Sequence, residues 1–243
     1  MGTRYFLALD GVKGDSLNSM YKGWFEVSNF DIDLTAAGGG ASTAFSPLTL
    51  TLDSNTGLAP LLALAATGQH VTGATLIGVT DGAGQAKLYQ LDLADVLVAN
   101  VEHHADLITG AGPTLTLDYS KIELETFTPD GTGGVVPEGQ FGFDLTTNTD
   151  GITVPSADPG GSVAASPQPI DYFMLIDGLN GGSTDSQHKG WFEISSFDFD
   201  LENPSTFNPK APPVLGKPQF SSLNVTLPQE AGLADLMALA ATG

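Results

Sequence analysis

One stretch of this sequence occurs twice. The second occurrence follows the first strand for strand and then stops, while the first continues for about 80 residues more. The matching runs are residues 5–11 with 172–178, 22–26 with 189–193, and 64–68 with 239–243. Because a long internal repeat reflects a duplicated structural unit, we predict one whole unit followed by the front half of a second.

Composition sets the boundaries and the class of the units. Residues 1–150 form the first predicted domain, 151–169 a linker rich in Pro, Gly and Ser, and 170–243 the partial second copy. Hydrophobic residues make up 41% of the chain, enough for a packed core, and the 30 glycines and 15 prolines favour short strands joined by turns. The predicted fold class is therefore mainly β (α+β).

The charge of the chain excludes several classes of partner. Eight Lys and Arg stand against 28 Asp and Glu, for a formal net charge of −20, which repels nucleic acid and anionic lipid surfaces. The absence of cysteine removes disulfides and thiol catalysis. No apolar run is long enough to insert into a membrane, and no Sec-type signal peptide is recognisable at the N-terminus.

Hydrophobic periodicity indicates strands around one helix. Strands are expected at residues 5–9, 23–34, 48–52, 75–80, 87–101, 114–127 and 141–145. The helix is expected at 57–67, capped by Ser54 or Asn55, with Leu62 in the core and Gly68 as its end. The alternation slips by one residue near Asp95 and again near Tyr119, which predicts β-bulges that help to close a barrel.

The sequence contains no pattern typical of catalysis. Adjacent strand residues point to opposite faces, so His103 and His104 are not expected to chelate one metal and are interpreted as solvated histidines at a strand end. His188 takes the place of Tyr21 in the repeat, and His70 has no companion that suggests a metal site. We therefore expect no catalytic residue, no metal ion and no cofactor.

Three other patterns are interpreted structurally. Glu123 and Glu125 share one face of a strand, and on so acidic a chain they are expected to form an outward polar stripe. Trp24 and Trp191 occupy equivalent positions and are assigned to packing of the barrel wall or a subunit face. Asp-Gly pairs begin at positions 10, 81, 130, 150 and 177 and lack calcium-loop spacing, so they predict turns.

Five stretches of the first copy, in order, carry a resemblance to a known family. They are residues 5–16, 22–23, 61–68, 88–98 and 117–123. With them the chain resembles the haemolysin-coregulated protein (Hcp) family, the tube protein of bacterial type VI secretion. The resemblance implies a small closed β-barrel with one helix. It also implies a non-enzymatic structural protein whose subunits form hexameric rings and stack into a tube that carries effectors.

The resemblance implies partners and a route as well. The chain itself is the expected partner, as a homo-oligomer, with secretion spike or effector proteins as further ones. It would be made in the bacterial cytoplasm and exported without a cleaved Sec signal. An exported fibre, matrix or surface protein that uses such barrels as polymer units, with strand exchange between subunits, is the alternative. The loops at 10–21 and 177–188 are expected at subunit contacts.

The partial copy bears on this choice. It keeps the apolar positions of the first copy without the strands that would cover them, so it is expected to be ordered only in contact with other protein. A neighbouring chain is the favoured cover. The alternatives are that the partial copy packs on the first copy, or that the chain is cut short of a longer natural protein.

Overall fold

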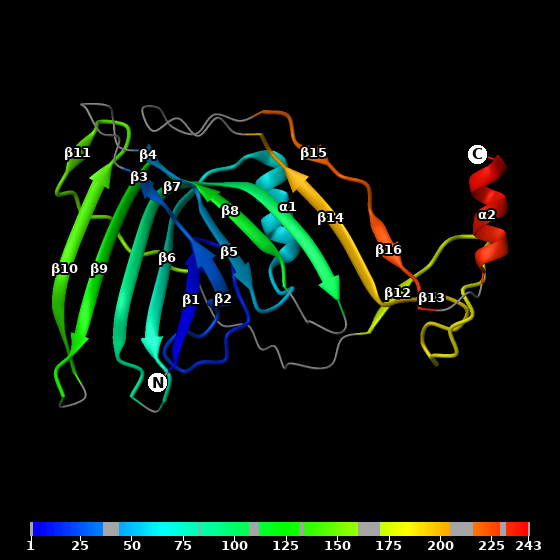
Figure 1. Cartoon of the computed structure of the whole chain (residues 1–243), viewed down its shortest axis with the longest axis horizontal. Helices are drawn as coiled ribbons and strands as arrows, with labels where there is room; N and C mark the ends of the chain where they lie inside the picture. The colour runs from blue at the N-terminus through cyan, green and yellow to red at the C-terminus, as the bar shows by residue number, and fades with distance from the viewer. Residues whose placement is uncertain are drawn as a thin grey trace.

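The computed structural model describes residues 2–35, 44–82, 84–106, 112–131, 134–159, 171–204, 216–228 and 232–242. Two parts follow one another along its longest axis, a barrel that contains the N-terminus and a smaller part that ends in the C-terminal helix (Figure 1). Below, copy one means residues 4–150 and the half-copy means residues 171–242.

Copy one is a closed antiparallel barrel of six strands, as the sequence predicts. The strands follow the order β6-β1-β2-β5-β8-β7, and the ring closes because β7 pairs with both β6 and β8. Their bounds are β1 Thr3–Leu9, β2 Phe25–Asp31, β5 Leu48–Leu52, β6 Val71–Thr80, β7 Lys87–Asp106 and β8 Thr114–Asp118. Alternating apolar side chains such as Leu7, Leu50 and Leu91 fill the interior.

Strand β7 makes the closure possible because it belongs to both sides of the barrel. Its first half pairs with β6 and with β9 (Lys121–Pro129), and its second half pairs with β8. Asp95, at the middle, has a left-handed φ of 54°. Opposite Asp95, Tyr119 and Ser120 lie outside any strand and separate β8 from β9. Bending both strands at one point lets the sheet turn a corner.

The two phase slips are thus explained differently from the prediction. The register of β7 against β8 and β9 is the same on both sides of the break, so the slips mark one shared bend. The β7–β8 register shift lies further on, between Val98 and Asn100. The expected single strand 114–127 is in fact two strands, and Tyr119 at the corner is buried and donates its hydroxyl to Ser46 O at 2.8 Å.

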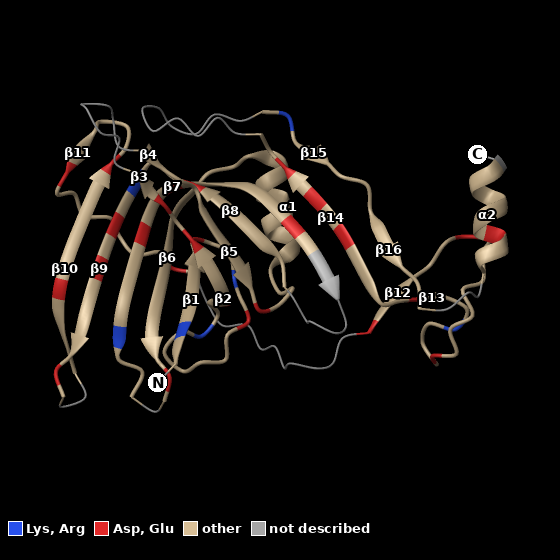
Figure 2. Cartoon of the chain, viewed as in Figure 1, with Lys and Arg blue, Asp and Glu red and all other residues tan. Residues whose placement is uncertain are grey.

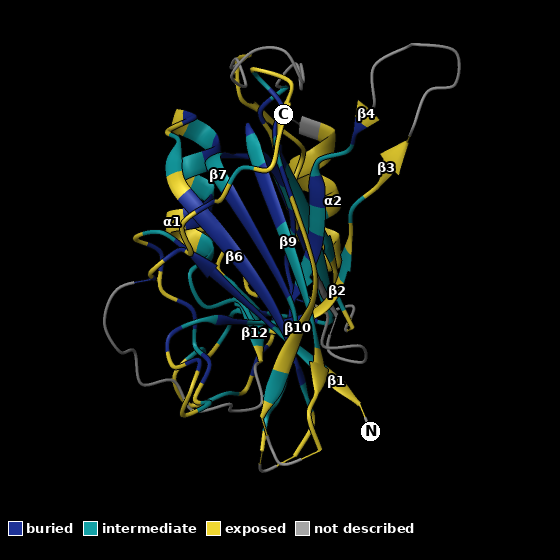
Figure 3. Cartoon of the chain, turned by 90° about the vertical axis from the view of Figure 1, so that its left-hand side faces the viewer, coloured by how far each residue is buried: buried dark blue, intermediate teal, exposed yellow. Residues whose placement is uncertain are grey.

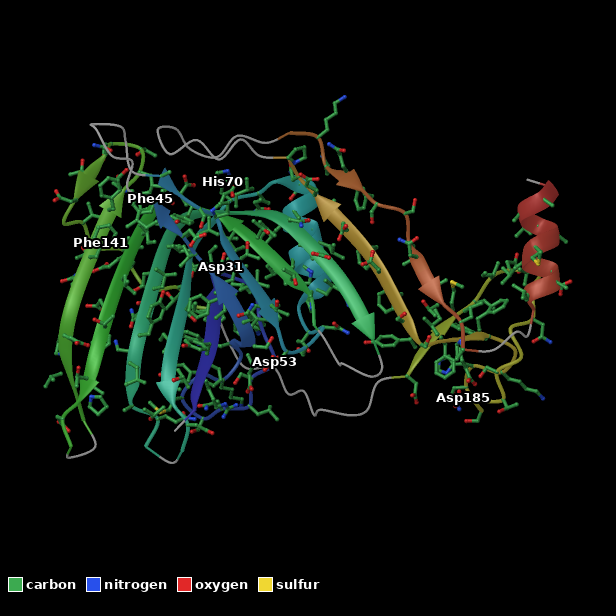
Figure 4. The ribbon with its side chains drawn as sticks, viewed as in Figure 1. Asp31, Phe45, Asp53, His70, Phe141 and Asp185 are labelled. Atoms are coloured by element: carbon green, nitrogen blue, oxygen red, sulfur yellow. The ribbon has the colours of Figure 1, made fainter. Side chains whose placement is uncertain are left out.

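Further elements extend the barrel. β10 (Val135–Asp144) and β11 (Thr149–Asp150) continue the sheet beyond β9. β3 (Leu34–Thr35) and β4 (Ala44–Phe45) form a separate two-stranded sheet, and β3 is exposed along its length (Figure 3). Phe45 of β4 lies beside Phe141 of β10, with ring centroids 6.5 Å apart (Figure 4).

Helix α1 (Leu58–Thr67) confirms the predicted helix and corrects two details. It ends at Gly68, in the left-handed conformation, as predicted. Its N-cap is Gly57 without a side-chain cap, and Ser54 Oγ accepts from Thr56 N instead. Leu61 and Ala65 are the buried residues, whereas Leu62 is half-buried. The helix packs against β7 and against β14 of the half-copy.

The half-copy reproduces the front half of copy one pair for pair. Tyr172 pairs with Ile194 as Tyr5 pairs with Val27, and Leu201 pairs with Phe220 as Leu34 pairs with Phe45. Its elements are β12 Tyr172–Met174, β13 Phe192–Ile194, β14 Ser196–Glu202, β15 Gln219–Phe220, β16 Asn224–Thr226 and α2 Leu233–Thr242. The same sequence pattern therefore gives the same local structure in both copies.

Candidate functional site: the junction of the two copies

The two copies are joined by a continuous sheet. β14 of the half-copy runs antiparallel to the end of β7, where β6 no longer covers that side. The pairing extends over seven residues, from Ser196 opposite Asp106 to Glu202 opposite Asn100. Because the free edge of a strand is a template for another strand, β14 acts as an added strand for the barrel of copy one (Figure 1).

An aromatic stack holds one face of this junction. The His103 ring lies against Phe197, with centroids 4.7 Å apart, and against Phe199 at 5.6 Å. Phe197 also meets Tyr172 edge-on at 5.1 Å. His103 is buried, so the prediction of a solvated histidine was wrong, because β14 covers the strand end that was expected to face water. The side chain of His104 lies outside the described residues.

Next to this stack, the half-copy enters the core of copy one. Leu201 is fully buried and belongs to the main hydrophobic cluster of the barrel. Asn203 is buried as well. Its Nδ2 donates to Ala65 O of α1 at 3.0 Å, and its backbone N–H donates to Ala99 O at 2.8 Å. The junction therefore combines strand pairing, apolar burial and a polar anchor on the helix.

The solvent face of the junction is acidic. Asp200 lies directly opposite Glu102 across the strand pair, and Figure 2 shows acidic positions on both β7 and β14. Like charges directly opposite each other destabilise a strand pair. Apolar burial on the inner face therefore works against a modest repulsion on the outer one.

Beyond the junction, the half-copy leaves an apolar surface uncovered. A hollow of about 410 Å³ is lined by Phe173, Met174, Ile194, Phe197, Phe199, Ser221, Leu223 and Val225. The counterparts of Leu223 and Val225 in copy one, Leu48 and Leu50, are buried in the barrel. Helix α2 exposes Leu233, Met237 and Leu239 and stands apart from the barrel in Figure 1. In copy one, β8 pairs with β5 and covers this face, and no strand among the described residues of the half-copy takes that position.

The paired glutamates do not form the expected outward stripe. Glu123 is buried and accepts hydrogen bonds from Gln140 Nε2 and Val154 N. Residues 152–158, from the segment predicted as linker, cross the outer face of the sheet here. Ala157 N donates to the buried Thr75 at 2.8 Å, and Asp158 N donates to Asp10 at 2.6 Å. Glu123 thus anchors this crossing segment, whereas Glu125 is half-buried.

Trp24, Trp191 and His188 have packing roles, and His70 lies beside an aspartate. Trp24 meets Tyr21 edge-on at 5.3 Å, and Tyr21 stacks on Phe6 at 4.7 Å. In the half-copy, Trp191 meets His188 at 5.1 Å, and His188 stacks on Phe173 at 4.3 Å. His188 therefore replaces Tyr21 in the same cluster. His70 Nδ1 lies 2.7 Å from Asp95 Oδ1, at the bend of β7.

Hydrogen bonds to one carboxylate of the half-copy fix the loop that carries His188. Asp185 accepts from Gln187 N at 2.8 Å and from His188 N and Nδ1 at 2.9 Å. The N–H of Gln187, followed by the His188 ring, lowers the pKa of Asp185. Figure 4 shows that Asp185 lies in the half-copy, far from Asp31 and Phe45 of copy one. These hydrogen bonds order the loop of the half-copy that carries His188.

The Asp-Gly pairs are turns, as predicted. The five glycines at positions 11, 82, 131, 151 and 178 all have positive φ, a conformation that glycine adopts without strain. Within the described ranges, no three His, Cys, Asp or Glu side chains gather in a way that could hold a metal ion. Packing of the partial copy on the first copy was one of the alternatives left open by the sequence, and β14 pairs with β7 in this way. The sequence carries one signal for this strand: Phe197, Phe199 and Leu201 alternate with acids, which indicates a strand with one buried face.

Comparison with known proteins agrees with this architecture. The family model described as "Type VI secretion system effector, Hcp" matches residues 6–125 and 173–243, in both copies. The crystal structure of Hcp1 from Salmonella typhimurium matches with a TM-score of 0.51 and 22% identity, over 62% of this chain and 99% of that one. A structure of a type six secretion system protein matches with a TM-score of 0.55 and 20% identity, over 62% and 100%. No match was found among curated proteins.

These findings identify the class of the molecule. The chain is one β-barrel joined by strand pairing to a partial second copy of the same unit, and it belongs to the Hcp family. It is a type VI secretion tube-like structural protein, with a tandem and partial second copy of the family fold. Among the described residues, neither helix has the length and apolarity needed to cross a bilayer.

Proposed function

We propose that this protein is a non-enzymatic subunit of a type VI secretion tube, which self-assembles into rings and carries effectors. The junction is the observation that carries the proposal: one Hcp-like unit accepts a strand of another unit at its β7 edge. A protein whose repeats already join edge to edge has the means to form larger assemblies.

The absence of catalysis is part of the proposal. Several candidates that the sequence offered have packing or anchoring roles. His103 stacks against two phenylalanines of β14, and Glu123 anchors a backbone segment. We propose that there is no catalytic, metal or cofactor site, and that spike or effector proteins are the partners besides the chain itself.

Export without a cleaved Sec signal is the proposed route. Residues Thr3–Leu9 are the central strand β1, with Leu7 and Leu9 in the barrel core. Removal of this segment after export would take away a wall of the barrel. We also propose the domain division at 1–150, 151–169 and 170–243.

Electron microscopy of the purified protein tests the proposal. We expect rings or short tubes, because a lateral contact repeated head to tail closes into a ring when its rotation permits. Fibres with no ring stage would favour the alternative of a matrix or surface polymer. The position of β14 on its own chain gives no specific support to that alternative.

A further inference from the structure

We infer that the outer face of copy one carries a binding site for an extended peptide, and that the partner it fits is a positively charged segment of another protein. The site, named here the cradle, consists of Asp10, Thr75, Gln90, Asp92 and Glu123. Residues 152–158, named the crossing segment, occupy it in the structure. The inference rests on the proposed function and deepens it, because it names the kind of segment by which a carried protein would attach.

The centre of the cradle is a row of polar side chains across three strands. Thr75 of β6 lies opposite Asp92 of β7, and Asp92 lies opposite Glu123 of β9. Leu91 and Leu93 beside Asp92 point into the barrel core, so the row lies on the outer face. Polar side chains on such a face usually meet water. Here they are only 0%, 2% and 5% exposed, because the crossing segment covers them.

The cradle holds the crossing segment by its main chain. Val154 N–H donates to the Glu123 carboxylate, and Ala157 N–H donates to Thr75 Oγ1 at 2.8 Å. The Thr75 hydroxyl donates in turn to Asp92 Oδ1 at 2.5 Å, which leaves its oxygen free to accept from the segment. Each of these acceptors is a side chain, so the segment is bound as a ligand would be and adds no strand to the sheet.

The spacing of the cradle matches an extended chain. Glu123 and Thr75 lie two strands apart, which corresponds to about 9.6 Å. Val154 and Ala157 are three residues apart, and three residues of extended chain cover about 10 Å. Two N–H groups of an extended segment therefore meet two acceptors without strain.

The cradle selects weakly among side chains. Val154 and Ala157 are buried, whereas Pro155 and Ser156 between them are exposed. Ser156 Oγ accepts from Gln90 Nε2 at 3.0 Å, and this is a contact that other polar residues can make. The cradle thus requires two small or medium apolar residues three positions apart and leaves the positions between them free.

The charge of the cradle does not match its resident segment. Asp10, Asp92 and Glu123 contribute three carboxyl groups, and none of them belongs to an ion pair among the described residues. The crossing segment has no Lys or Arg and adds Asp158, whose N–H donates to Asp10 at 2.6 Å. Charged donors bind carboxylates about twice as strongly as neutral ones do. A basic extended segment would therefore complement the cradle better than the resident one.

Peptide binding to the full chain tests the inference. Ala157→Pro removes the N–H that binds Thr75 and so weakens the resident segment. The probes are two labelled synthetic peptides, residues 151–159 with the natural sequence and the same peptide with Asp158→Lys. Measured by fluorescence anisotropy, the dissociation constant of either peptide should be at least about tenfold lower for the Ala157→Pro chain than for the natural chain, because the tethered competitor is weakened.

The two peptides and a pair of matched variants sharpen the test. The Asp158→Lys peptide should bind about two- to fivefold more tightly than the natural one at low salt, and high salt should reduce the difference. Thr75→Val in the Ala157→Pro background should weaken binding by about threefold or more, whereas Thr49→Val on β5 should not. Binding that persists after Thr75→Val would overturn the inference. Equal binding of both peptides would overturn it too, since it would point to exchange of crossing segments between copies.

A second arm uses the natural chain and avoids the proline. The Asp158→Lys peptide at a concentration of about a millimolar should compete with the tethered segment. Hydrogen exchange of the Val154 and Ala157 amides should then become at least about threefold faster, with the Leu7 amide of β1 unchanged. No acceleration would overturn the inference. Rings without peptide binding would leave the proposed function intact and refute the cradle, and peptide binding without rings or tubes would do the reverse.

Discussion

The front half of copy one and the half-copy have the same strand registers and opposite patterns of exposure. Leu48 is 0% exposed and its counterpart Leu223 is 58% exposed, while Leu34 and Leu201 show the reverse. Local sequence therefore determines which residues pair within each front half. Burial depends on which strands arrive from elsewhere: β8 covers Leu48, and β7 covers Leu201.

The largest expected effect compares the two helices. Leu61 is buried in the barrel core, whereas its counterpart Leu236 is only half-buried on α2. Leu61→Ala should lower the free energy of unfolding by about 2 to 5 kcal/mol, since it leaves a cavity. Leu236→Ala should change it by less than about 1 kcal/mol. Denaturant unfolding of both variants measures the difference, and equal losses would show that α2 is as well packed as α1.

This comparison also shows what sequence could predict. The helix at 58–67, the barrel and the duplicated registers follow from periodicity, Gly68 and the repeat, all of which are local signals. The role of His103 was missed because its burial depends on Phe197 and Phe199, which lie far away in the chain. Glu123 was misassigned for the same reason, since the backbone N–H that it accepts comes from Val154.

The second prediction concerns a residue that only copy one has. The Tyr119 hydroxyl donates to Ser46 O at 2.8 Å, and this ties the back half of the barrel to the front half. Tyr119→Phe should cost about 1 to 1.5 kcal/mol, because it leaves the carbonyl without this donor and preserves the packing. Thermal unfolding measures the loss. Tyr89→Phe, at a half-buried site, serves as the control, and an equal effect there would mean that the hydrogen bond contributes little.

Asp144 gives the back half a dependence on pH. Burial alone would raise its pKa, but hydrogen bonds from Thr146, Thr147 and Lys121 lower the pKa to about 2. A carboxyl whose folded pKa lies below its unfolded value near 4 stabilises the fold above about pH 4 and loses that effect as pH falls toward 2. Asp144→Asn should therefore lower stability by about 1 kcal/mol at neutral pH and remove this acid dependence. Urea unfolding at pH 7 and pH 2.5 measures the free energy of unfolding of the natural protein and of the variant. If the loss of stability between the two pH values is the same in both, the assignment is contradicted.

The smallest expected effect again compares the copies, at the junction. Asp200 lies opposite Glu102, and one of its carboxylate oxygens is buried without a hydrogen-bond partner among the described residues. Asp200→Asn should strengthen the junction by roughly 0.2 to 1 kcal/mol, since it removes a directly opposed like charge, and the gain should shrink at high salt. The counterpart Asp33 is exposed, and no strand in the described part of the chain lies opposite it as β7 lies opposite Asp200, so Asp33→Asn should have no measurable effect in a monomer. Hydrogen exchange of the β14 amides measures the opening of the junction in both variants. Slower exchange in Asp200→Asn alone would support the pairing, whereas slower exchange in both would point to a general effect of net charge.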